Sequence, residues 1–307
     1  MRNADIAMYA AKRLKQGHSV YDQQRDLHSV RNLTLIGDLR RAVEKDELEM
    51  VYQPKMSCLS DAPVGLEALV RWTHPVHGSL PPDEFVGLAE RTGLIRPLTR
   101  RILEKTLRQA ALWRRQHLDY PIAVNLSALN LKEDDLPWTL RQLLDEFDLP
   151  AKSILLEITE TVIMEDPQRA MNIVSELAFM GVKISIDDFG TGYSSLAYLR
   201  KLPAGELKID RSFVMEMDTD REDTVIVRSI IEMAHNLGLQ VVAEGVETEA
   251  AWQSLKKLGC DFGQGYFFSR PLPPLEITRW LRTHAAPPSG MDGLSDLDTA
   301  SRQQAIT

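Results

Sequence analysis

The sequence predicts an α/β protein whose architecture is a (β/α)8 barrel. Eight short apolar runs alternate with helical patterns over about 250 residues, which is the usual count and size of this fold. Polar residues stand at or near the C-terminal end of nearly every run, where such barrels collect their functional groups. A doubly wound open sheet is the competing architecture, but its ligand site gathers around one switch point. The spread of polar residues therefore favours the barrel.

The expected strands and helices follow one another in regular alternation. The strands are expected at residues 49–54, 64–72, 122–127, 154–159, 183–187, 206–210, 240–244 and 261–268. The helices are expected at residues 34–45, 83–91, 98–116, 136–147, 167–180, 223–237 and 249–258. Glycine follows four of these helices, where a C-cap residue is expected: Gly93, Gly181, Gly238 and Gly259.

The two ends of the chain differ from this alternating centre. Residues 3–21 predict one amphipathic helix and a short extended piece, together too short to be a domain. Residues 285–307 are rich in Pro, Gly, Asp, Ser and Gln and poor in apolar residues, so they predict a disordered tail. The barrel is therefore expected to occupy residues 30–284.

Composition and charge are those of an ordinary globular protein of 307 residues, 44% of them hydrophobic. The net charge of −8 argues against a broad basic surface for duplex nucleic acid, so a small anionic ligand would need a metal. Cys58 and Cys260 are too few for a disulfide framework, which makes the reducing cytosol the expected compartment. No apolar run approaches the roughly 18 residues of a membrane-spanning helix. We therefore expect no membrane contact within this chain; an anchor would have to belong to a longer parent protein.

Carboxylate and amide side chains interrupt five of the predicted strands. Glu157, for example, stands within the apolar run of residues 153–159. An unpaired buried charge would cost several kcal/mol, so a compensating group is expected nearby. The interrupting residues are Glu67, Asn125, Glu157, the pair Asp187 and Asp188, and Glu244. Oxygen ligands that arrive from five strands predict a cation-centred active site.

Such oxygen ligands are the kind that Mg²⁺ prefers. Adjacent strand residues point to opposite faces, so Asp187 and Asp188 can share a site only where the strand ends and bends. The glycines of the following Phe-Gly-Thr-Gly-Tyr sequence, residues 189–193, permit that bend. Asp187 could then bridge two cations. Two metals about 3.5–4 Å apart activate a water in phosphoester hydrolysis, so the sequence suggests a phosphodiesterase-like reaction.

Lys208 is the candidate for positioning the attacking water. Asp210 is two residues further along the same apolar run and shares its face of the strand, so a plain ion pair between the two is the alternative. A lone strand carboxylate is more often paired or at a sheet edge, but five coincident interruptions weaken that explanation. Glu160, Glu247 and Glu249 are more typical of helix starts, which they would cap or solvate. The sequence carries no P-loop and no Gly-x-Ser-x-Gly elbow.

Eight motifs follow one another in order along the barrel segment. They are Tyr52-Gln53-Pro54-Lys55, Glu67-Ala68-Leu69-Val70-Arg71-Trp72, Val124-Asn125-Leu126-Ser127, Leu156-Glu157-Ile158-Thr159-Glu160, Asp187-Asp188-Phe189-Gly190-Thr191-Gly192, Leu207-Lys208-Ile209-Asp210, Ala243-Glu244-Gly245-Val246-Glu247 and Gln264-Gly265-Tyr266. In these motifs the chain resembles the EAL family of bacterial cyclic di-GMP phosphodiesterases, over roughly residues 33–281. No element expected of that family is missing.

The resemblance implies a modified, TIM-like barrel whose first strand is antiparallel to the rest. It also implies hydrolysis of the second messenger cyclic di-GMP to linear pGpG with Mg²⁺ or Mn²⁺, and inhibition by Ca²⁺. By position, Glu67, Asn125, Glu157 and Asp187 would bind a first metal, and Asp187 with Asp188 a second. Lys208 and Glu244 would act on the catalytic water. Gln53, Leu69, Arg71, Asp210 and Gln264 would lie at the substrate, where a guanidinium can fork onto a phosphate.

The resemblance also implies a regulatory loop at residues 188–195, which includes Phe189, Gly190, Thr191 and Gly192. Glu160 would hold that loop against the barrel. Such a loop often lies close to a dimer interface, which suggests a homodimer. Residues 3–21 resemble the last helix and strand of a GGDEF domain, so residues 1–24 are expected to be its remnant and a linker. A longer parent protein with GGDEF or sensor domains is therefore implied.

Two functions of other classes compete with catalysis. Degenerate EAL members are non-catalytic receptors that bind cyclic di-GMP, but the complete set of metal ligands and Lys208 count against that role. A protein-interaction scaffold that binds neither nucleotide nor metal is the second. The presence of Gln53 and Arg71 argues for substrate contact and against a scaffold.

Overall fold

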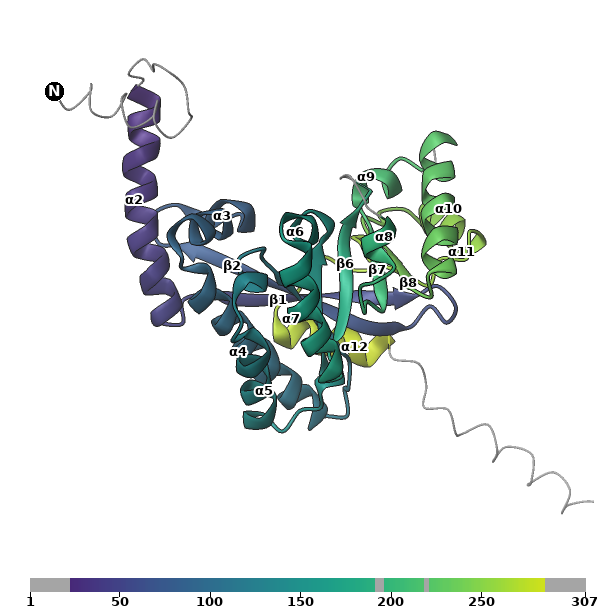
Figure 1. The fold of residues 1–307 in the computed structure, drawn as a ribbon, viewed down its shortest axis with the longest axis horizontal. Helices are drawn as coiled ribbons and strands as arrows, with labels where there is room; N and C mark the ends of the chain where they lie inside the picture. The colour runs from purple at the N-terminus through teal and green to yellow at the C-terminus, as the bar shows by residue number, and fades with distance from the viewer. Residues whose placement is uncertain (1–22, 191–195, 218–220, 285–307) are drawn as a thin grey trace, which may run out of the picture.

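The strands of the protein close into a barrel (Figure 1). The computed structural model describes residues 23–190, 196–217 and 221–284. Its sheet has the order β1-β9-β8-β7-β6-β5-β4-β2-β3, and an additional pairing of β1 with β2 completes the closure around eight of these strands. β3 pairs only with β2 and lies outside the closed ring. The prediction of a (β/α)8-type barrel is confirmed.

The first strand is antiparallel to both of its neighbours in the ring, β2 and β9. The other neighbouring pairs of the ring are parallel, which confirms the modified barrel. The strands are β1 Glu49–Ser57, β2 Pro63–His74, β3 Gly78–Leu80, β4 Ile122–Leu126, β5 Ile154–Thr159, β6 Lys183–Phe189, β7 Glu206–Ile209, β8 Gln240–Ala243 and β9 Phe262–Gly263. The β3 strand was not predicted. β9 is much shorter than the expected 261–268, because the chain turns at Gly265.

Helices cover the outside of the barrel and include all seven that the sequence predicts. They are α2 Gln23–Glu44, α3 Pro82–Thr92, α4 Ile95–Arg114, α5 Leu136–Glu146, α6 Glu160–Glu165, α7 Pro167–Phe179, α8 Leu196–Leu199, α9 Arg211–Val214, α10 Arg221–Asn236, α11 Glu249–Lys257 and α12 Pro274–His284. Single 3-10 turns stand at Asn130–Lys132 and Ala151–Ser153. The four expected C-cap glycines all have positive φ, between 76° and 91°: Gly93, Gly181, Gly238 and Gly259. The helices α6, α8, α9 and α12 were not predicted.

The helix α2 lies at one side of the barrel, against α3 and α4, and the α10 and α11 helices lie on the other side (Figure 1). Leu35 and Leu39 of α2 are buried, and an ion pair of 2.8 Å joins Arg31 to Glu84. The helix runs without a break through the expected boundary between residues 24 and 30. The expected helix and strand at 3–21 and the expected tail at 285–307 lie outside the described residues.

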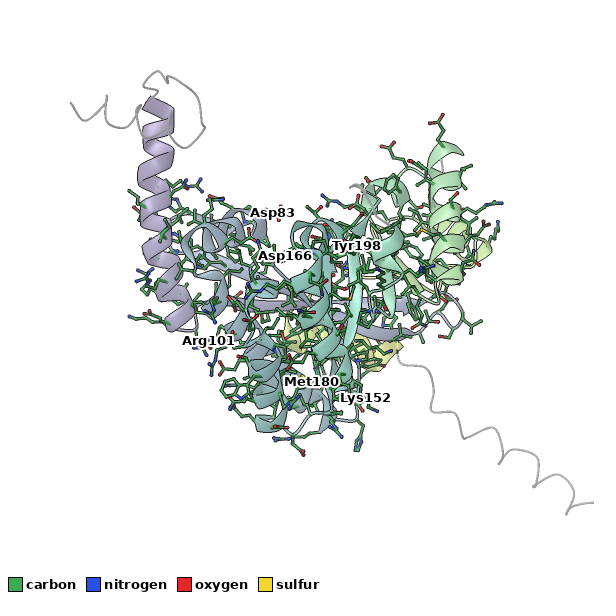
Figure 2. All side chains as sticks on the ribbon, viewed as in Figure 1. Asp83, Arg101, Lys152, Asp166, Met180 and Tyr198 are labelled. Carbon is green, nitrogen blue, oxygen red and sulfur yellow. The ribbon has the colours of Figure 1, made fainter. Side chains whose placement is uncertain are left out.

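The strands of the ring alternate between two buried environments. In β5, Ile154, Leu156 and Ile158 are fully buried toward the helices, whereas Glu157 lies inside the barrel with the other charged groups. Exposed charges such as Asp83 and Lys152 lie on the outer surface (Figure 2). None of the helices described here is long and apolar enough to cross a membrane.

Candidate active site

The ammonium group of Lys208 lies at the centre of a ring of carboxylates inside the barrel. Lys208 is on β7, and its side chain is 1% exposed. Its Nζ lies 2.6 Å from Glu244 Oε1, 3.0 Å from Glu157 Oε2 and 3.3 Å from Asp187 Oδ1. The Oε2 atom of Glu67 is 3.9 Å away. The structure therefore brings together carboxylates that the sequence separates by up to 177 positions, since 244 − 67 = 177.

A set of amide side chains holds the carboxylate of Glu67. Asn125 Nδ2 donates to Glu67 Oε1 at 2.7 Å, and Gln264 Nε2 donates to Glu67 Oε2 at 2.6 Å. The same Gln264 nitrogen lies 3.2 Å from Gln53 Oε1, and Gln53 Nε2 donates to the carbonyl of Ser269 at 3.0 Å. Asn125 uses its nitrogen on Glu67, and its side-chain oxygen is an acceptor that can serve as a ligand. Residues from β1, β2, β4 and the end of β9 thus form one network.

Asp187 and Asp188 lie on the same side of the backbone because β6 is irregular at its end. The pairing of β6 with β7 shifts register between Ile186 and Phe189, and Asp188 has a φ of 54°. The backbone N–H of Asp188 donates to Asp187 Oδ1 at 2.9 Å. This is the bend that the sequence requires if the two neighbouring carboxylates are to share a site.

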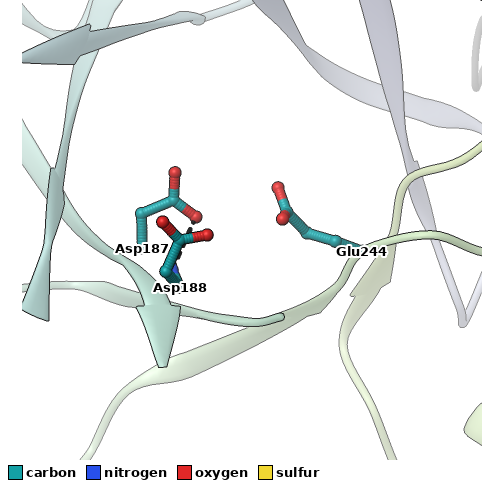
Figure 3. Close-up of side chains that lie close together, drawn as sticks. All are labelled: Asp187, Asp188 and Glu244. Atoms are coloured by element: carbon teal, nitrogen blue, oxygen red, sulfur yellow. Dashed lines mark hydrogen bonds between the residues drawn. The ribbon is translucent and has the colours of Figure 1, made fainter. Parts of the chain in front are cut away.

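Glu244 joins these two aspartates as a third carboxylate (Figure 3). One oxygen atom from each of Asp187, Asp188 and Glu244 lies within 4.8 Å of the others. Glu244 immediately follows β8, and its N–H donates to the carbonyl of Ile209 at 3.2 Å, which fixes the end of β8 against β7. Three hard oxygen donors at this spacing suit a divalent cation.

The group carries more negative than positive charge. In the part of the chain that the structure describes, five carboxylates face the single ammonium of Lys208. Burial raises the pKa of the Glu157 carboxyl well above its usual range, and repulsion from Glu67 adds to this against the attraction of Lys208. Burial also raises the pKa of Glu244, to about 8, again against Lys208.

The pKa values of the other charged groups in the cluster shift in different directions, although all of these groups are at least partly buried. Burial and the neighbouring Asp187 raise the pKa of Asp188. Burial would raise the pKa of Glu67 too, but Lys208 and the hydrogen bond from Gln264 lower it overall. Burial would lower the pKa of Lys208, but the carboxylates raise it well above its usual range. Positive charge is what this site lacks, so its donor set fits divalent metal ions.

The residues expected at the substrate occupy three kinds of position relative to this cluster. Leu69 and Arg71 alternate with Glu67 along β2 and so share its face, and Arg71 donates to the carbonyl of Val70 at 2.9 Å. Asp210 lies just beyond β7, where it caps α9 by accepting from Ser212 N at 3.0 Å. Its negative charge contributes to the raised pKa of Asp188, which places it near the aspartate pair. Gln53 and Gln264 are buried in the network around Glu67.

The comparison with protein families decides the identity of the chain. The model of the family described as EAL domain matches residues 36–271. The chain belongs to the EAL domain family. Members of this family depend on metal ions, in agreement with the acidic cluster of the barrel.

Characterised relatives of this EAL domain are considerably longer than the chain. The bifunctional diguanylate cyclase/cyclic di-GMP phosphodiesterase MucR of Pseudomonas aeruginosa is 44% identical over 279 residues, which are 90% of this chain and 41% of MucR. The cyclic di-GMP phosphodiesterase NbdA of the same organism is 40% identical over 293 residues, 94% of this chain and 37% of NbdA. The chain thus spans about two fifths of the length of these relatives.

The barrel is also similar to solved EAL structures. The PaMucR phosphodiesterase in complex with c-di-GMP is 45% identical and superposes with a TM-score of 0.76, covering 80% of this chain and 99% of that one. The similarity therefore extends over essentially the whole of the PaMucR domain.

The expected regulatory loop of this EAL domain is described only at its start. Phe189 is buried at the end of β6, and Gly190 has a φ of 102°, so the chain turns there as the sequence predicts. Thr191 and Gly192 lie outside the described residues. Glu160 begins α6 but is only 6% exposed, so it is not the solvated helix start that its position suggests. Among the described residues, neither of its carboxylate oxygens has a hydrogen-bond partner.

Two glycines that position the EAL site were not singled out from the sequence for that role. A Cβ on Gly265 would lie 2.1 Å from the backbone carbonyl oxygen of Val246, and Gly245 has a φ of 70° and packs on Arg211. The backbone of Val246 accepts from and donates to the residues around Gly265, with Val246 N to Gln264 O at 3.0 Å. This close contact aligns Gln264 with the end of β8. The only signal in the sequence is that each glycine adjoins a polar site residue.

Proposed function

We propose that this EAL domain hydrolyses cyclic di-GMP to linear pGpG in a metal-dependent reaction. The observation that carries the proposal is the position of Lys208 among Glu157, Asp187 and Glu244, within 3.3 Å of each. A binding module would have no need of a buried ammonium among metal-type carboxylates. The names of MucR and NbdA, and the cyclic di-GMP in the PaMucR complex, support this substrate.

The chain holds enough oxygen donors for two divalent ions, and we assign Mg²⁺ or Mn²⁺ to them. Glu67, Asn125, Glu157 and Asp187 would hold the first ion, and Asp187 with Asp188 the second. When bound, such ions lower the pKa of a water and neutralise charge on the phosphate. Ca²⁺ is larger and prefers more ligands at longer distances, which supports its role as an inhibitor.

Two side chains of the barrel then act on the attacking water. Lys208 is held protonated by its carboxylate neighbours, so it donates hydrogen bonds and orients the water rather than removing its proton. Glu244 accepts from Lys208 at 2.6 Å and is the carboxylate best placed to receive the proton of the water. Lys208 is buried inside the barrel, where electrostatic interactions are stronger than in water.

We assign the substrate contacts from the chemistry of the side chains near the cluster. Arg71 presents a planar guanidinium that can bind a phosphate with two parallel hydrogen bonds. Leu69 offers an apolar surface for a guanine, while Gln53, Gln264 and Asp210 offer groups that hydrogen-bond with its edges or with the sugar. The reducing cytosol is the compartment that suits a nucleotide substrate and two free thiols.

The proposal predicts metal-dependent conversion of cyclic di-GMP to pGpG, which chromatography can measure. Purified protein with Mg²⁺ or Mn²⁺ should convert cyclic di-GMP to pGpG, whereas Ca²⁺ or a chelator should prevent it, since the acidic cluster needs a permissive cation. Unchanged cyclic di-GMP that still binds to the protein would contradict hydrolysis and assign the non-catalytic receptor function instead. Absence of both binding and turnover would indicate a scaffold.

We further propose that the domain acts as a homodimer in which association adjusts metal occupancy through the loop that begins at Phe189. The link between the loop and the metal site is supported by α6, which begins at Glu160 and packs on β6, the strand that carries Asp187 and from which the loop leaves. Specific activity should therefore fall as dilution separates the subunits, which light scattering coupled to size exclusion would follow. A monomer whose activity is unchanged at high dilution would contradict the proposal. Residues 1–24 as a GGDEF remnant, and sensor domains in a longer parent protein, stay predictions.

A further inference from the structure

A second ion pair lies inside the barrel, below the site already described. Lys55 Nζ is 2.6 Å from Glu206 Oε2, and the two side chains are 12% and 7% exposed. Ser185 Oγ donates to the other oxygen of Glu206 at 3.3 Å. β1, which carries Lys55, and β7, which carries Glu206, are not neighbours in the sheet. The pair therefore spans the interior of the barrel, and the proposed reaction does not use it.

This ion pair forms the layer directly beneath the proposed catalytic cluster. Glu206 precedes Lys208 by two residues on β7, so both side chains point into the barrel, with their Cα atoms about 6.6 Å apart. The same two-residue step separates Ser185 from Asp187, and Lys55 from Gln53. A barrel interior is built from such layers. Glu206 is thus a sixth interior carboxylate, one layer below the five that surround Lys208.

The path of the Lys55 side chain is fixed by its surroundings. A Cβ on Gly65, the β1–β2 partner of Lys55, would lie 3.4 Å from Lys55 Cε and 3.2 Å from the carbonyl oxygen of Pro121. The ammonium also lies 5.2 Å from the centre of the Phe262 ring. The space beside Gly65 thus admits the lysine stem and directs its charge to Glu206.

Neutralisation of Glu206 has a consequence for Lys208. Without Lys55, Glu206 would lose its only ion-pair partner among the described residues, and a buried anion left without a counter-charge is strongly unfavourable. The ammonium of Lys208, two residues further along the same strand and on the same face, is one candidate for that counter-charge. Its movement downward would separate it from Glu244 and from the water that it orients.

We propose that Lys55 is a positioning residue, which neutralises Glu206 and so leaves Lys208 to the carboxylates of the active site. The catalytic part of this inference rests on the proposed function. The structural part, which concerns the carboxylate that Lys208 contacts, does not rest on the proposed function.

Three variants test the inference: Lys55→Gln, Glu206→Gln and the double variant. Lys55→Gln keeps a hydrogen-bond donor for Glu206 but removes the charge. It should lower kcat roughly ten-fold or more, with KM for cyclic di-GMP within about two-fold of the wild type, because the lost interaction concerns the water. The double variant should recover kcat to within about three-fold, since the competing anion is gone. Glu206→Gln alone should retain kcat for the same reason.

Two further measurements do not depend on turnover. A crystal structure of Lys55→Gln should place Lys208 Nζ within about 4 Å of a Glu206 oxygen, the distance of an ion pair. Mn²⁺ measured by calorimetry should bind this variant on the order of five-fold more tightly, because its carboxylates have lost a competing ammonium. General damage to the site would instead lower kcat and Mn²⁺ affinity together. If the wild type has no turnover, the proposed function fails, and these two measurements still decide the position of Lys208.

Several outcomes would overturn the inference. A Lys55→Gln variant with a lowered Tm but wild-type kcat, measured well below that Tm, would make the pair purely structural. A double variant as slow as Lys55→Gln would exclude competition by Glu206. If Lys55→Gln does not fold, Ser185→Asp adds a second anion to the same layer and should lower kcat in the same way, with Ser185→Asn as its neutral control. Equal kcat in the two Ser185 variants would contradict the proposal.

Discussion

Replacement of Asp187 by asparagine should abolish most turnover of cyclic di-GMP and leave the fold intact. Asp187 contacts Lys208, is one of the three clustered carboxylates and is proposed to touch both metal ions. Loss of several kcal/mol of metal-derived stabilisation corresponds to a decrease of about a thousand-fold in kcat. Asparagine keeps the oxygen that accepts from Asp188 N, so the bend at the end of β6 is preserved.

The stability of the metal-free protein distinguishes this effect from unfolding. Because five carboxylates face one ammonium, Asp187→Asn removes repulsion, and the Tm without metal should be unchanged or slightly higher. Calorimetry should show weakened Mn²⁺ binding. Asp38→Asn is the matched control, since Asp38 pairs with His74 far from the cluster and its turnover should stay within about two-fold. Wild-type kcat in Asp187→Asn would remove Asp187 from the proposed metal site.

The fold was largely predictable because its elements depend on local patterns. The run of residues 154–159 coincides with β5, and the four helix-ending glycines adopt the expected positive φ. The elements that were predicted wrongly or missed also have local causes. Phe267 and Phe268 extend the apolar pattern of β9, but the chain has already turned at Gly265, where only a glycine fits against the Val246 backbone. The helix α12 starts at Pro274, at the end of a Pro-Leu-Pro-Pro run that by itself indicates a loop.

The sequence predicts which residues form the site, but not which of them contact one another. Buried carboxylates are costly, so Glu157 and Asp187 are conspicuous in any apolar strand. Contacts between strands that are distant in the sequence could not be predicted in this way. Lys55 and Glu206 are 151 positions apart, and neither is unusual in its own segment, so nothing local indicates that they meet. The role of Glu244 as a third carboxylate beside Asp187 and Asp188 likewise depends on barrel closure.

Replacement of Lys208 by methionine should reduce turnover far more than it reduces nucleotide binding. Its four ion pairs among the described residues are all with carboxylates, none of which is a proposed substrate contact. Loss of a group that orients the reacting water is expected to lower kcat by roughly 10²–10⁴, while KM changes only a few-fold. Binding can be measured separately by calorimetry with Ca²⁺ in place of Mg²⁺, so that the nucleotide is not hydrolysed.

Stability supplies the independent readout for Lys208→Met. The substitution leaves the carboxylates of the barrel without an internal cation, so the metal-free protein should melt well below the wild type. Saturating Mn²⁺ should recover most of this Tm, because the ion restores the missing charge and binds only the folded state. Lys256→Met is the matched control, since Lys256 pairs with Asp61 outside the site and should leave both kcat and the Mn²⁺ response unchanged. If Lys208→Met lost nucleotide affinity as much as kcat, or if Mn²⁺ failed to restore its Tm, Lys208 would be a structural ion-pair partner rather than the residue that orients the water.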